Sequence, residues 1–439
     1  MQRKTIYAII IGLIIGLASG TVIGYSVHTY TPPVKQTTTL EVWTPFAGEQ
    51  GEVDFWGNLS IAFQNATGVA LSVSQYSGDT YFTKIASSFA SSAPPDVYVT
   101  YGAGDLASYV KVGEAANLTS LLNEDWAMGQ ITPTQRSYGM INGTTYALPL
   151  EIDTDWLFVN ANIFNQYGIP IPSTTGNWTW AQFLSACQAI KSHGIAPVTI
   201  DGADSWSTDL LTNYFIERMN GPTAFMDAYS RHQSFTPIMN KTYSAIQAFT
   251  NSGYLQSGWQ TMQYMDAWSA FTTGKAAMWL NGAWIVGISP NTSNFTITAA
   301  PFPYFPQISN KTSWNNWVDG GPTMLAVAPQ AHHVAQAIDL LRFLSEPEWL
   351  DRYVALVGTN IAQNVVMPPG LSPPALTEIV NGMNAAPEVA IRFGSQVDPT
   401  FGGTFTTQDS EVWAGTTTPA AAAAALEAQA TTQFGAVKP

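Results

Sequence analysis

Basic residues and cysteine are both scarce in this chain. Its 439 residues include 16 Lys and Arg against 30 Asp and Glu, which gives a net charge of -14 at pH 7. Nucleic-acid binding needs clustered Lys and Arg, and no basic cluster follows Arg3 and Lys4, so the composition excludes nucleic acid as a partner. Cys187 is the only cysteine, so no intramolecular disulfide can form, and its helical spacing with Phe183 predicts core packing.

The shortage of positive charge also suggests an acidic medium. Charged residues make up only 10% of the chain. In acid the carboxylates are neutralised and every Lys or Arg adds repulsion, so a chain with few basic groups suits that medium. We hypothesise an acidic habitat, and unfolding well before pH 3 would contradict it.

Common catalytic and metal-binding motifs are absent from the sequence. It contains no G-x-S-x-G, no H-E-x-x-H, and no cysteine close to a histidine. Gly274 and Lys275 lack the other residues of a phosphate loop. His332 and His333 are adjacent, and adjacent helical residues point to different sides, so a solvated helix start is favoured over a metal site. We therefore expect no catalytic residue, no cofactor and no metal.

The N-terminal segment predicts an address outside the cell. Residues 6–27 are apolar and long enough to span a bilayer as a helix, which takes about 20 residues. Arg3 and Lys4 are expected to stay on the cytoplasmic side and leave the rest outside. Residues 1–27 are thus predicted to be a membrane anchor or, alternatively, a cleaved export signal, and residues 28–39 a proline-containing exposed linker.

Glycosylation signals support the same address. Each Asn-x-Ser/Thr triplet alone is weak evidence, but together they suggest a glycosylated exterior protein. The acceptor positions are Asn58, Asn65, Asn117, Asn142, Asn177, Asn240, Asn291, Asn294 and Asn310.

From Leu40 onward, short apolar strands alternate with amphipathic helices. "TLEVWTP" predicts a strand, residues 52–68 a helix that ends at Gly68, and "VALSVSQY" the next strand. Near the C-terminus a helix is predicted with Thr418 as its cap and Pro419 at its first position. Alternating strands and helices indicate α/β layers with largely parallel sheets, in which ligands bind beyond the carboxyl ends of the strands.

Several of the loops at those strand ends combine aromatic residues with carboxylates. Examples are "WTPFAGEQG" after the first strand, "YGAGDLASY" after a later one, and "EIDTDW". In "VTIDGADSWSTDLL", a helix cap or a solvated turn is the favoured interpretation for Asp201, Asp204 and Asp209.

Four segments, in order, resemble the extracellular solute-binding proteins of ABC importers, in the sugar-binding group related to maltose-binding protein. They are "APPDVYVTYGAGDLASYVKVGEAANLTSLL", "INGTTYALPLEIDTDWLFVNANIF", "FTTGKAAMWLNGAWIVG" and "GGPTMLAVAPQAHHVAQAIDLLRFLSEPEWLDRY". The resemblance implies a two-lobed α/β fold of the type II periplasmic-binding-protein kind, with three crossings and a hinge between the lobes. It places lobe 1 at 40–150 plus 300–345 and lobe 2 at 151–299 plus 346–435.

The resemblance also implies a sugar site. Trp279 is expected in a buried strand, whereas Trp284, just beyond that strand, is expected to face the cleft as an aromatic platform for a sugar ring. The other implied ligand-binding residues are Phe46, Glu49, Gln50, Tyr101, Asp105, Asp153, Asp319 and Gly320, with Trp43, Trp206 and Trp317 as further candidates that could equally pack at the lobe boundary. The first loop lacks the basic residues of the best-known relatives, so the choice of sugar stays open.

Capture of a sugar between two closing lobes, with no chemistry, is therefore the expected function. The partners implied by the resemblance are a membrane permease and an ATPase on separate chains, and a monomer is expected. An exported glycoside hydrolase, with Asp153 and Asp155 as acid and base, is one alternative. A membrane-fixed sensor or adhesion module is another, and a peptide or polyol-phosphate importer is a third, although the few basic residues disfavour a phosphate.

Overall fold

The computed structural model of the chain describes residues 38–102, 104–122, 133–173, 178–288, 296–306, 318–357, 379, 382 and 389–438. Within it, Thr39–Pro439 forms one compact unit, and the expected anchor and linker lie almost entirely outside the described residues. Among the described residues, no helix has the length and apolar character that crossing a bilayer requires.

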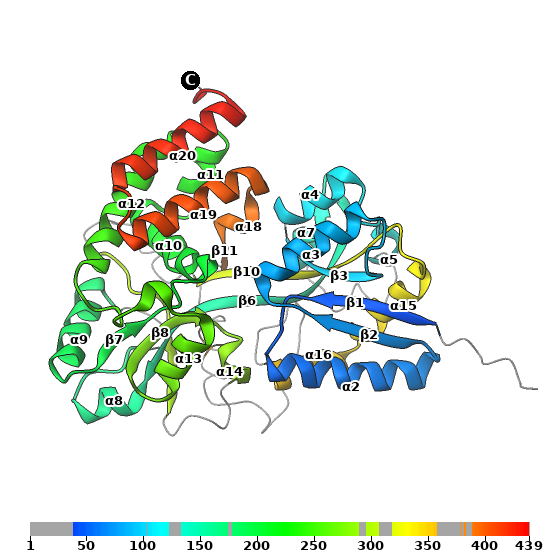
Figure 1. The fold of residues 1–439 in the computed structure, drawn as a ribbon, viewed down its shortest axis with the longest axis horizontal. Helices are drawn as coiled ribbons and strands as arrows, with labels where there is room; N and C mark the ends of the chain where they lie inside the picture. Colours follow the sequence, from blue (N-terminus) through cyan, green and yellow to red (C-terminus); the bar gives the residue numbers. More distant parts are fainter. Residues whose placement is uncertain are drawn as a thin grey trace, which may run out of the picture. The chain divides into compact units, whose positions relative to one another are not determined.

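A nine-stranded sheet runs through this unit (Figure 1). Its main path follows the order β2-β1-β3-β10-β6-β8-β7, with β11 added to β10 and β9 added to β6. The strands are β1 Thr39–Thr44, β2 Ala70–Gln75, β3 Val97–Tyr101, β6 Ala147–Asn160, β7 Ala196–Thr199, β8 Ala276–Gly282, β9 Ile297–Ala300, β10 Val318–Val327 and β11 Val389–Ile391. A separate hairpin joins β4 Met140–Ile141 to β5 Thr144–Thr145.

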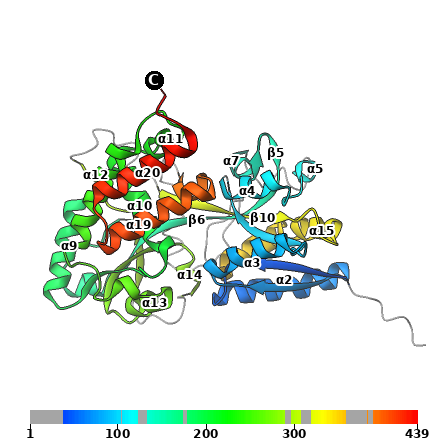
Figure 2. The same ribbon diagram turned by 45° about the horizontal axis from the view of Figure 1, so that its top comes forward.

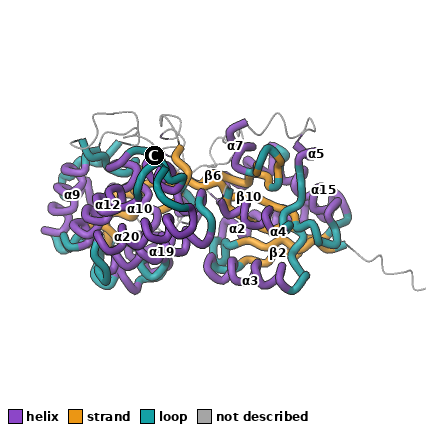
Figure 3. Tube along the Cα trace, turned by 90° about the horizontal axis from the view of Figure 1, so that it is seen from above, coloured by secondary structure: helices purple, strands orange, loops and turns teal. Residues whose placement is uncertain are grey.

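Strands β6 and β10 connect the two halves of the sheet. The first part of β6 pairs with β10, and its last residues, from Asp155 onward, pair with β8 and β9. In Figure 3, β6 leads from one group of helices to the other. Around β6 the pairing is antiparallel, and among the strands that the structure describes only the ladders β1–β2, β1–β3, β7–β8 and β10–β11 are parallel. The expectation of largely parallel sheets is therefore wrong: the sheet is mixed, because crossing strands run against their neighbours.

One hydrophobic core lies around β1, β2 and β3. It is covered by α2 Gln50–Thr67, α3 Gly78–Ala90, α4 Gly104–Val112, α15 Val334–Leu344 and α16 Pro347–Val357, and the short helices α5 Thr119–Leu122 and α7 Pro133–Tyr138 lie nearby. As predicted, α2 ends at Gly68, whose φ of 77° is the left-handed conformation that glycine adopts readily. Trp349 and Tyr353 of α16 pack in this core, although the expected boundaries put α16 in the other lobe.

The second core is larger and is built mainly from helices. Its helices are α8 Ala161–Gln166, α9 Trp180–Ser192, α10 Ser205–Asn220, α11 Ala224–Tyr229, α12 Phe235–Thr250, η1 Trp259–Thr261, α18 Phe393–Gln396, α19 Pro399–Ala414 and α20 Pro419–Phe434. Two further helices, α13 Tyr264–Thr272 and α14 Ile285–Ile288, pack in a smaller cluster around Trp156 and Trp279. Figure 2 shows α19 and α20 over α10 and α12. Thr418 caps α20 and Cys187 is buried, both as predicted.

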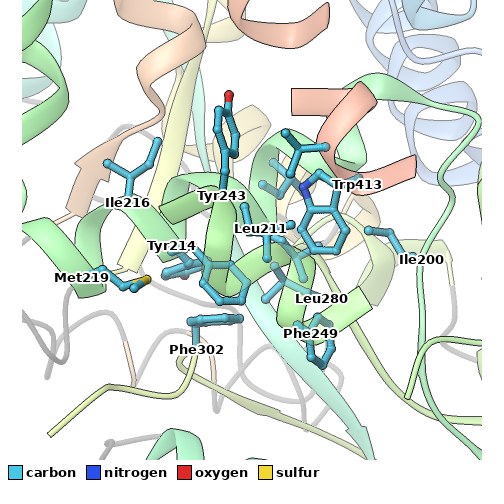
Figure 4. Packing of buried hydrophobic residues seen from close by; sticks show 14 of the residues in the cluster. Ile200, Leu211, Tyr214, Ile216, Met219, Tyr243, Phe249, Leu280, Phe302 and Trp413 are labelled. Atoms are coloured by element: carbon cyan, nitrogen blue, oxygen red, sulfur yellow. The ribbon is translucent and has the colours of Figure 1, made fainter. Parts of the chain in front are cut away.

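Aromatic side chains fill much of the second core. Tyr214 stacks on Phe302 with ring centroids 5.0 Å apart, and Trp413 lies on the other side of the cluster (Figure 4). Phe302 and Phe305 belong to this core, although the expected boundaries put them in the first lobe. The lobe assignment as a whole stays a prediction, with α16 and residues 300–305 packing outside their expected lobes.

Helix α10 is buried although it carries several charged residues. Asp209 on α10 accepts a hydrogen bond from Thr406 at 3.1 Å, and Asp409 on α19 accepts one from Thr212 at 2.6 Å. The remaining oxygens, Asp209 Oδ1 and Asp409 Oδ2, are buried and have no donor among the described residues when both carboxyls are ionised. The Asp209 charge, after burial, raises the pKa of Asp409, so the two carboxyls are close enough to share a proton.

This carboxyl pair predicts stability that falls as the pH rises. Burial raises the pKa of Asp209 to about 6 and the pKa of Asp409 well above its usual value. Because both folded-state pKa values exceed the unfolded ones, the contribution is complete below about pH 4 and is lost as the pH rises through 6 and beyond. Asp409→Asn supplies an amide donor in place of the proton, so we expect a flatter dependence of the unfolding free energy on pH.

Urea denaturation at pH 4 and pH 8 checks this expectation. At pH 8 the unfolding free energy of the Asp409→Asn variant should exceed that of the wild type by about 1–2 kcal/mol. At pH 4 the two unfolding free energies should be nearly equal. Asp339→Asn, at a side chain that is 55% exposed, is the matched control and should leave the pH profile unchanged. An Asp409→Asn variant with the wild-type pH profile would contradict the shared proton.

Candidate functional site

An arginine ties three strands together where the two halves of the sheet meet. Arg392, directly after β11, donates from its backbone N–H to the carbonyl of Gly320 on β10 at 2.8 Å. Its guanidinium Nη2 lies 3.1 Å from Asp153 Oδ2 and 2.5 Å from Asp155 Oδ1, both on β6. Its Nε donates to Asp155 Oδ2 at 2.7 Å, so the Asp155 contact is bidentate.

The two aspartates are held by this arginine and by the backbone. Asp153 also accepts from the N–H of Gly321 at 2.9 Å. A Cβ at Gly321 would stand 2.9 Å from the Arg392 guanidinium, so glycine lets the strand approach this closely. Burial raises the pKa of Asp155 to about 6, and the Arg392 charge opposes that shift. Two of the predicted ligand residues, Asp153 and Gly320, therefore lie where the two halves of the sheet meet. Together with Arg392 and Asp155 they form a group that we call the Arg392 clamp.

Beside Arg392 lies a group of three aromatic rings, those of Trp284, Trp206 and Tyr264. Trp284, in the turn between β8 and α14, is half-buried, and the Arg392 guanidinium lies 5.8 Å from its ring centroid. The Trp206 ring lies 5.9 Å from that of Trp284 and 5.8 Å from that of Tyr264. Trp284 Nε1 donates to the Tyr264 hydroxyl at 3.0 Å, which fixes the orientation of the indole. By contrast, Trp279 is completely buried, as predicted.

Gly282, at the end of β8, sets the position of the Trp284 ring. A Cβ at this glycine would stand 1.8 Å from a carbon of the indole, so Gly282→Ala must displace the ring. The ring is half-buried and can move, so we expect a melting temperature within a few degrees of the wild type but a roughly tenfold loss of affinity for any ligand that stacks on Trp284. Thermal melting and ligand titration together check this. An unchanged affinity would mean that the ring position does not matter.

Glu49 is a carboxylate near one of these rings, that of Tyr264. It precedes α2 and is half-buried, and burial together with the nearby Glu151 and Asp153 carboxylates raises its pKa to about 8. Glu49 also contributes to the raised pKa of Tyr264, after burial, so the two side chains are near each other. At neutral pH its carboxyl is thus largely protonated and can both donate and accept a hydrogen bond.

The other residues of the first predicted loop are less involved. Gln50 is exposed and its amide donates to Asp54 at 2.7 Å along α2. Phe46 and Trp43 pack against the first core, and the Trp43 ring meets Tyr76 edge-on at 5.3 Å. Trp43 and Phe46 thus have packing roles in the first core, and their roles in ligand binding stay predictions.

Tyr101 and Asp105 follow β3. Asp105 Oδ2 accepts from the Thr100 hydroxyl at 2.7 Å and from the Tyr101 N–H at 3.0 Å, so this oxygen stabilises the turn between β3 and α4. Burial raises the pKa of the Tyr101 hydroxyl and the Asp153 carboxylate adds to that shift, which places Tyr101 near the clamp.

Asp319 and Trp317 complete the predicted set. Asp319 is only 2% exposed, its N–H donates to the Tyr214 hydroxyl at 3.1 Å, and burial, followed by the Glu217 charge, raises the pKa of its carboxyl well above the usual value. Trp317 lies outside the described residues. The ligand roles of all these residues stay predictions.

Three aspartates differ from the favoured interpretation as caps or solvated turns. Asp201 is fully buried and accepts from the Ser207 hydroxyl at 2.8 Å. Asp204 precedes α10 but accepts from the Tyr264 N–H at 2.9 Å, and Asp209 lies within α10. The contacts of Asp204 with Tyr264 and of Asp209 with Thr406 are long-range and cannot be read from local sequence, whereas Asp201 and Ser207 are only 6 positions apart. The structure also begins α15 directly after His333, and the described residues contain no group of His, Cys, Asp and Glu that could hold a metal ion.

Sequence comparisons relate the chain to solute-binding proteins. It is 22% identical over 232 residues to a multiple sugar-binding protein of Streptococcus mutans, a match that covers 51% of this chain and 52% of that protein. It is equally 22% identical over 232 residues to the glucose-binding protein GlcS of Saccharolobus solfataricus, which covers 50% of this chain and 40% of that protein. The chain thus spans about half the length of these curated relatives.

Structural comparisons show the fold. A structure from work on xylan utilization by Caldanaerobius polysaccharolyticus has a TM-score of 0.81 at 21% identity, covering 89% of this chain and 99% of that one. A chitin oligosaccharide binding protein has a TM-score of 0.80 at 18% identity, covering 90% and 98%. RafE in complex with raffinose has a TM-score of 0.73 at 19% identity, covering 89% and 98%. The predicted two-lobed α/β fold is thereby confirmed.

The family model for bacterial extracellular solute-binding proteins matches residues 38–350, which is most of the chain. That range holds β3, the β6 crossing and the Trp284 turn, which lie in three of the four segments that carry the resemblance in the sequence. The chain therefore belongs to the bacterial extracellular solute-binding proteins.

Proposed function

We propose that this chain is the substrate-binding subunit of an ABC importer, which captures a mono- or oligosaccharide outside the cell and delivers it to a membrane permease. The observation that carries the proposal is the half-buried Trp284 ring, held by Tyr264 and Trp206 beside the Arg392 clamp. One face of a pyranose consists of C–H groups, which pack on a flat aromatic ring, while its hydroxyls need polar partners. Sugar-binding names among the relatives support the same ligand class.

Closure of the two lobes on the sugar is the proposed mechanism. Glu49 lies in the expected first lobe, and Trp284 and Tyr264 lie in the expected second lobe, so a ligand that contacts all three would bind best when the lobes are together. Its higher affinity for that form shifts the population toward closure. The closed monomer then docks on the permease, with ATP hydrolysis on a separate chain.

We further propose that the protein performs no chemistry on the sugar. Both carboxylates that a hydrolase interpretation would use, Asp153 and Asp155, contact Arg392, and Asp155 is fully buried. An acid and a base that share one arginine are poorly placed to flank a glycosidic bond. Release of products on long incubation with oligosaccharides would overturn this part of the proposal.

The proposed location is the outer face of the cell membrane, with residues 1–27 as anchor or export signal. Glycosylation is part of this proposal. Every acceptor asparagine whose side chain the structure describes is exposed, namely Asn58, Asn65, Asn117, Asn142 and Asn240.

A thermal-shift screen tests the sugar assignment. A ligand that binds only the folded state at a hundred times its dissociation constant contributes about 2.7 kcal/mol to stability and raises the melting temperature. We expect at least one neutral sugar to do so among xylose, glucose, galactose, raffinose, stachyose and chitin oligosaccharides. If only peptides raise the melting temperature, the family assignment stands and the sugar assignment falls.

A further inference from the structure

An exposed aromatic ring extends the candidate site on the first lobe. Phe82 on α3 is 38% exposed, whereas its neighbour Tyr81 is completely buried. The Phe82 ring centroid lies 5.9 Å from that of Tyr101, at an interplanar angle of 41°. Core packing explains Tyr81 but leaves much of the Phe82 ring in contact with solvent. A large apolar ring in this position is available to a ligand.

Several aromatic rings lie near the Arg392 guanidinium or near the strands that it joins. Trp206 and Trp284 lie 5.9 Å apart, and the Arg392 guanidinium lies 5.8 Å from the Trp284 ring. Asp153, which binds Arg392, is paired with Gly321 of β10, and Tyr101 is paired with Thr323 on the other side of the same strand. The Phe82 ring, in the expected first lobe, lies next to the Tyr101 ring. Phe82 and Trp284 thus offer two separate aromatic surfaces, whereas one pyranose ring stacks on one of them.

We infer that Phe82, with Tyr101, forms a second ring-binding subsite, so that the ligand is an oligosaccharide with one ring on Trp284 and another on Phe82. This inference rests on the proposed sugar-binding function. The C–H face of the second sugar ring would pack on Phe82 as that of the first packs on Trp284. The polar groups near Asp153 that a sugar hydroxyl could meet are the Glu49 carboxyl and the Arg392 guanidinium.

Chain-length dependence of binding tests the subsite. The full-length protein is titrated in a calorimeter with three homologous series, each starting from a single-ring sugar: xylose to xylotetraose, galactose to melibiose, raffinose and stachyose, and N-acetylglucosamine to its tetramer. Wild type should bind the longer members of one series more tightly than the shortest. Phe82→Ala should lower the affinity for those longer members about fivefold to tenfold and leave the shortest member unchanged.

Two further variants make the result specific. Phe82→Trp keeps a ring and should restore the preference for longer members. Ile61→Ala removes another exposed apolar side chain, 64% exposed on α2, and should change nothing. Melting temperatures show that each variant folds.

The outcomes separate this inference from the proposed function. If wild type binds the shortest sugar as tightly as the longest, or if Phe82→Ala weakens every length equally or none, the second subsite is wrong while sugar binding stands. If no member of any series binds wild type, the proposed function itself fails, and the subsite with it.

Discussion

Trp284→Ala is expected to weaken sugar binding by about 2–3 kcal/mol, roughly a thirtyfold to hundredfold rise in the dissociation constant. The indole is half-buried, so part of its surface is available, and its N–H is bound to Tyr264 at 3.0 Å, so the ring is already oriented before a ligand arrives. A preorganised aromatic surface stabilises a complex without an added ordering cost. Removing it therefore removes most of the stacking contribution.

A matched tryptophan distinguishes a lost binding surface from a damaged fold. Trp178 is also half-buried in the second core, where its ring meets Phe183 edge-on at 5.6 Å. We expect Trp178→Ala to lower the melting temperature but to leave the dissociation constant for sugar unchanged. Trp284→Phe, which keeps a ring, should recover part of the affinity. Equal losses of affinity in Trp178→Ala and Trp284→Ala would contradict a direct role for Trp284.

Arg392→Ala is expected to destabilise the fold by about 3–5 kcal/mol, the usual cost of leaving a buried charge without its partner. Asp155 has a side chain with no exposed surface and Asp153 one that is 8% exposed, and both contact this guanidinium. The arginine also bonds Gly320, so its loss loosens β6, β10 and the segment after β11 together. Urea denaturation at pH 7 measures the loss.

The destabilisation by Arg392→Ala should shrink in acid. Burial raises the pKa of Asp155 to about 6 even with the arginine present, so without it the carboxyl takes up a proton more readily and its buried charge disappears below that pH. Arg352, half-exposed and paired with Glu348 at 2.9 Å, is the surface control, and Arg352→Ala should cost less than about 1 kcal/mol. A cost for Arg392→Ala below that of Arg352→Ala would contradict the clamp.

Local sequence predicts much of this structure because local interactions decide it. Strand β1, the end of α2 at Gly68 and the Thr418 cap of α20 depend on neighbouring residues, and all lie where the sequence places them. The contrast between buried Trp279 and half-buried Trp284 follows from a strand ending in Asn-Gly. The family resemblance supplied the two-lobed fold, which periodicity alone does not distinguish from other α/β arrangements.

The features that the sequence does not reveal depend on distant residues. Arg392 is separated from Asp155 by 237 positions, and nothing around it suggests a binding role, although any arginine is notable in a chain with 16 basic residues. The sequence does not single out Tyr264 as a site residue for the same reason, because its partner Trp284 lies 20 positions away. The Asp209–Asp409 pair joins helices that are remote in the chain. Local sequence therefore favours a helix cap or solvated turn for Asp209, whereas the structure places its carboxyl in a buried pair. That pair also agrees with the hypothesis of an acidic habitat.

Calorimetric titration of the full-length protein with the sugar that most raises its melting temperature tests the central claim most directly. We predict saturable binding at one site with a dissociation constant near 1 μM, about -8 kcal/mol, and a much weaker signal for Trp284→Ala. Saturable binding that Trp284→Ala leaves unchanged, or no binding of any sugar by a folded protein, would contradict the account of Trp284 as the platform of a sugar site.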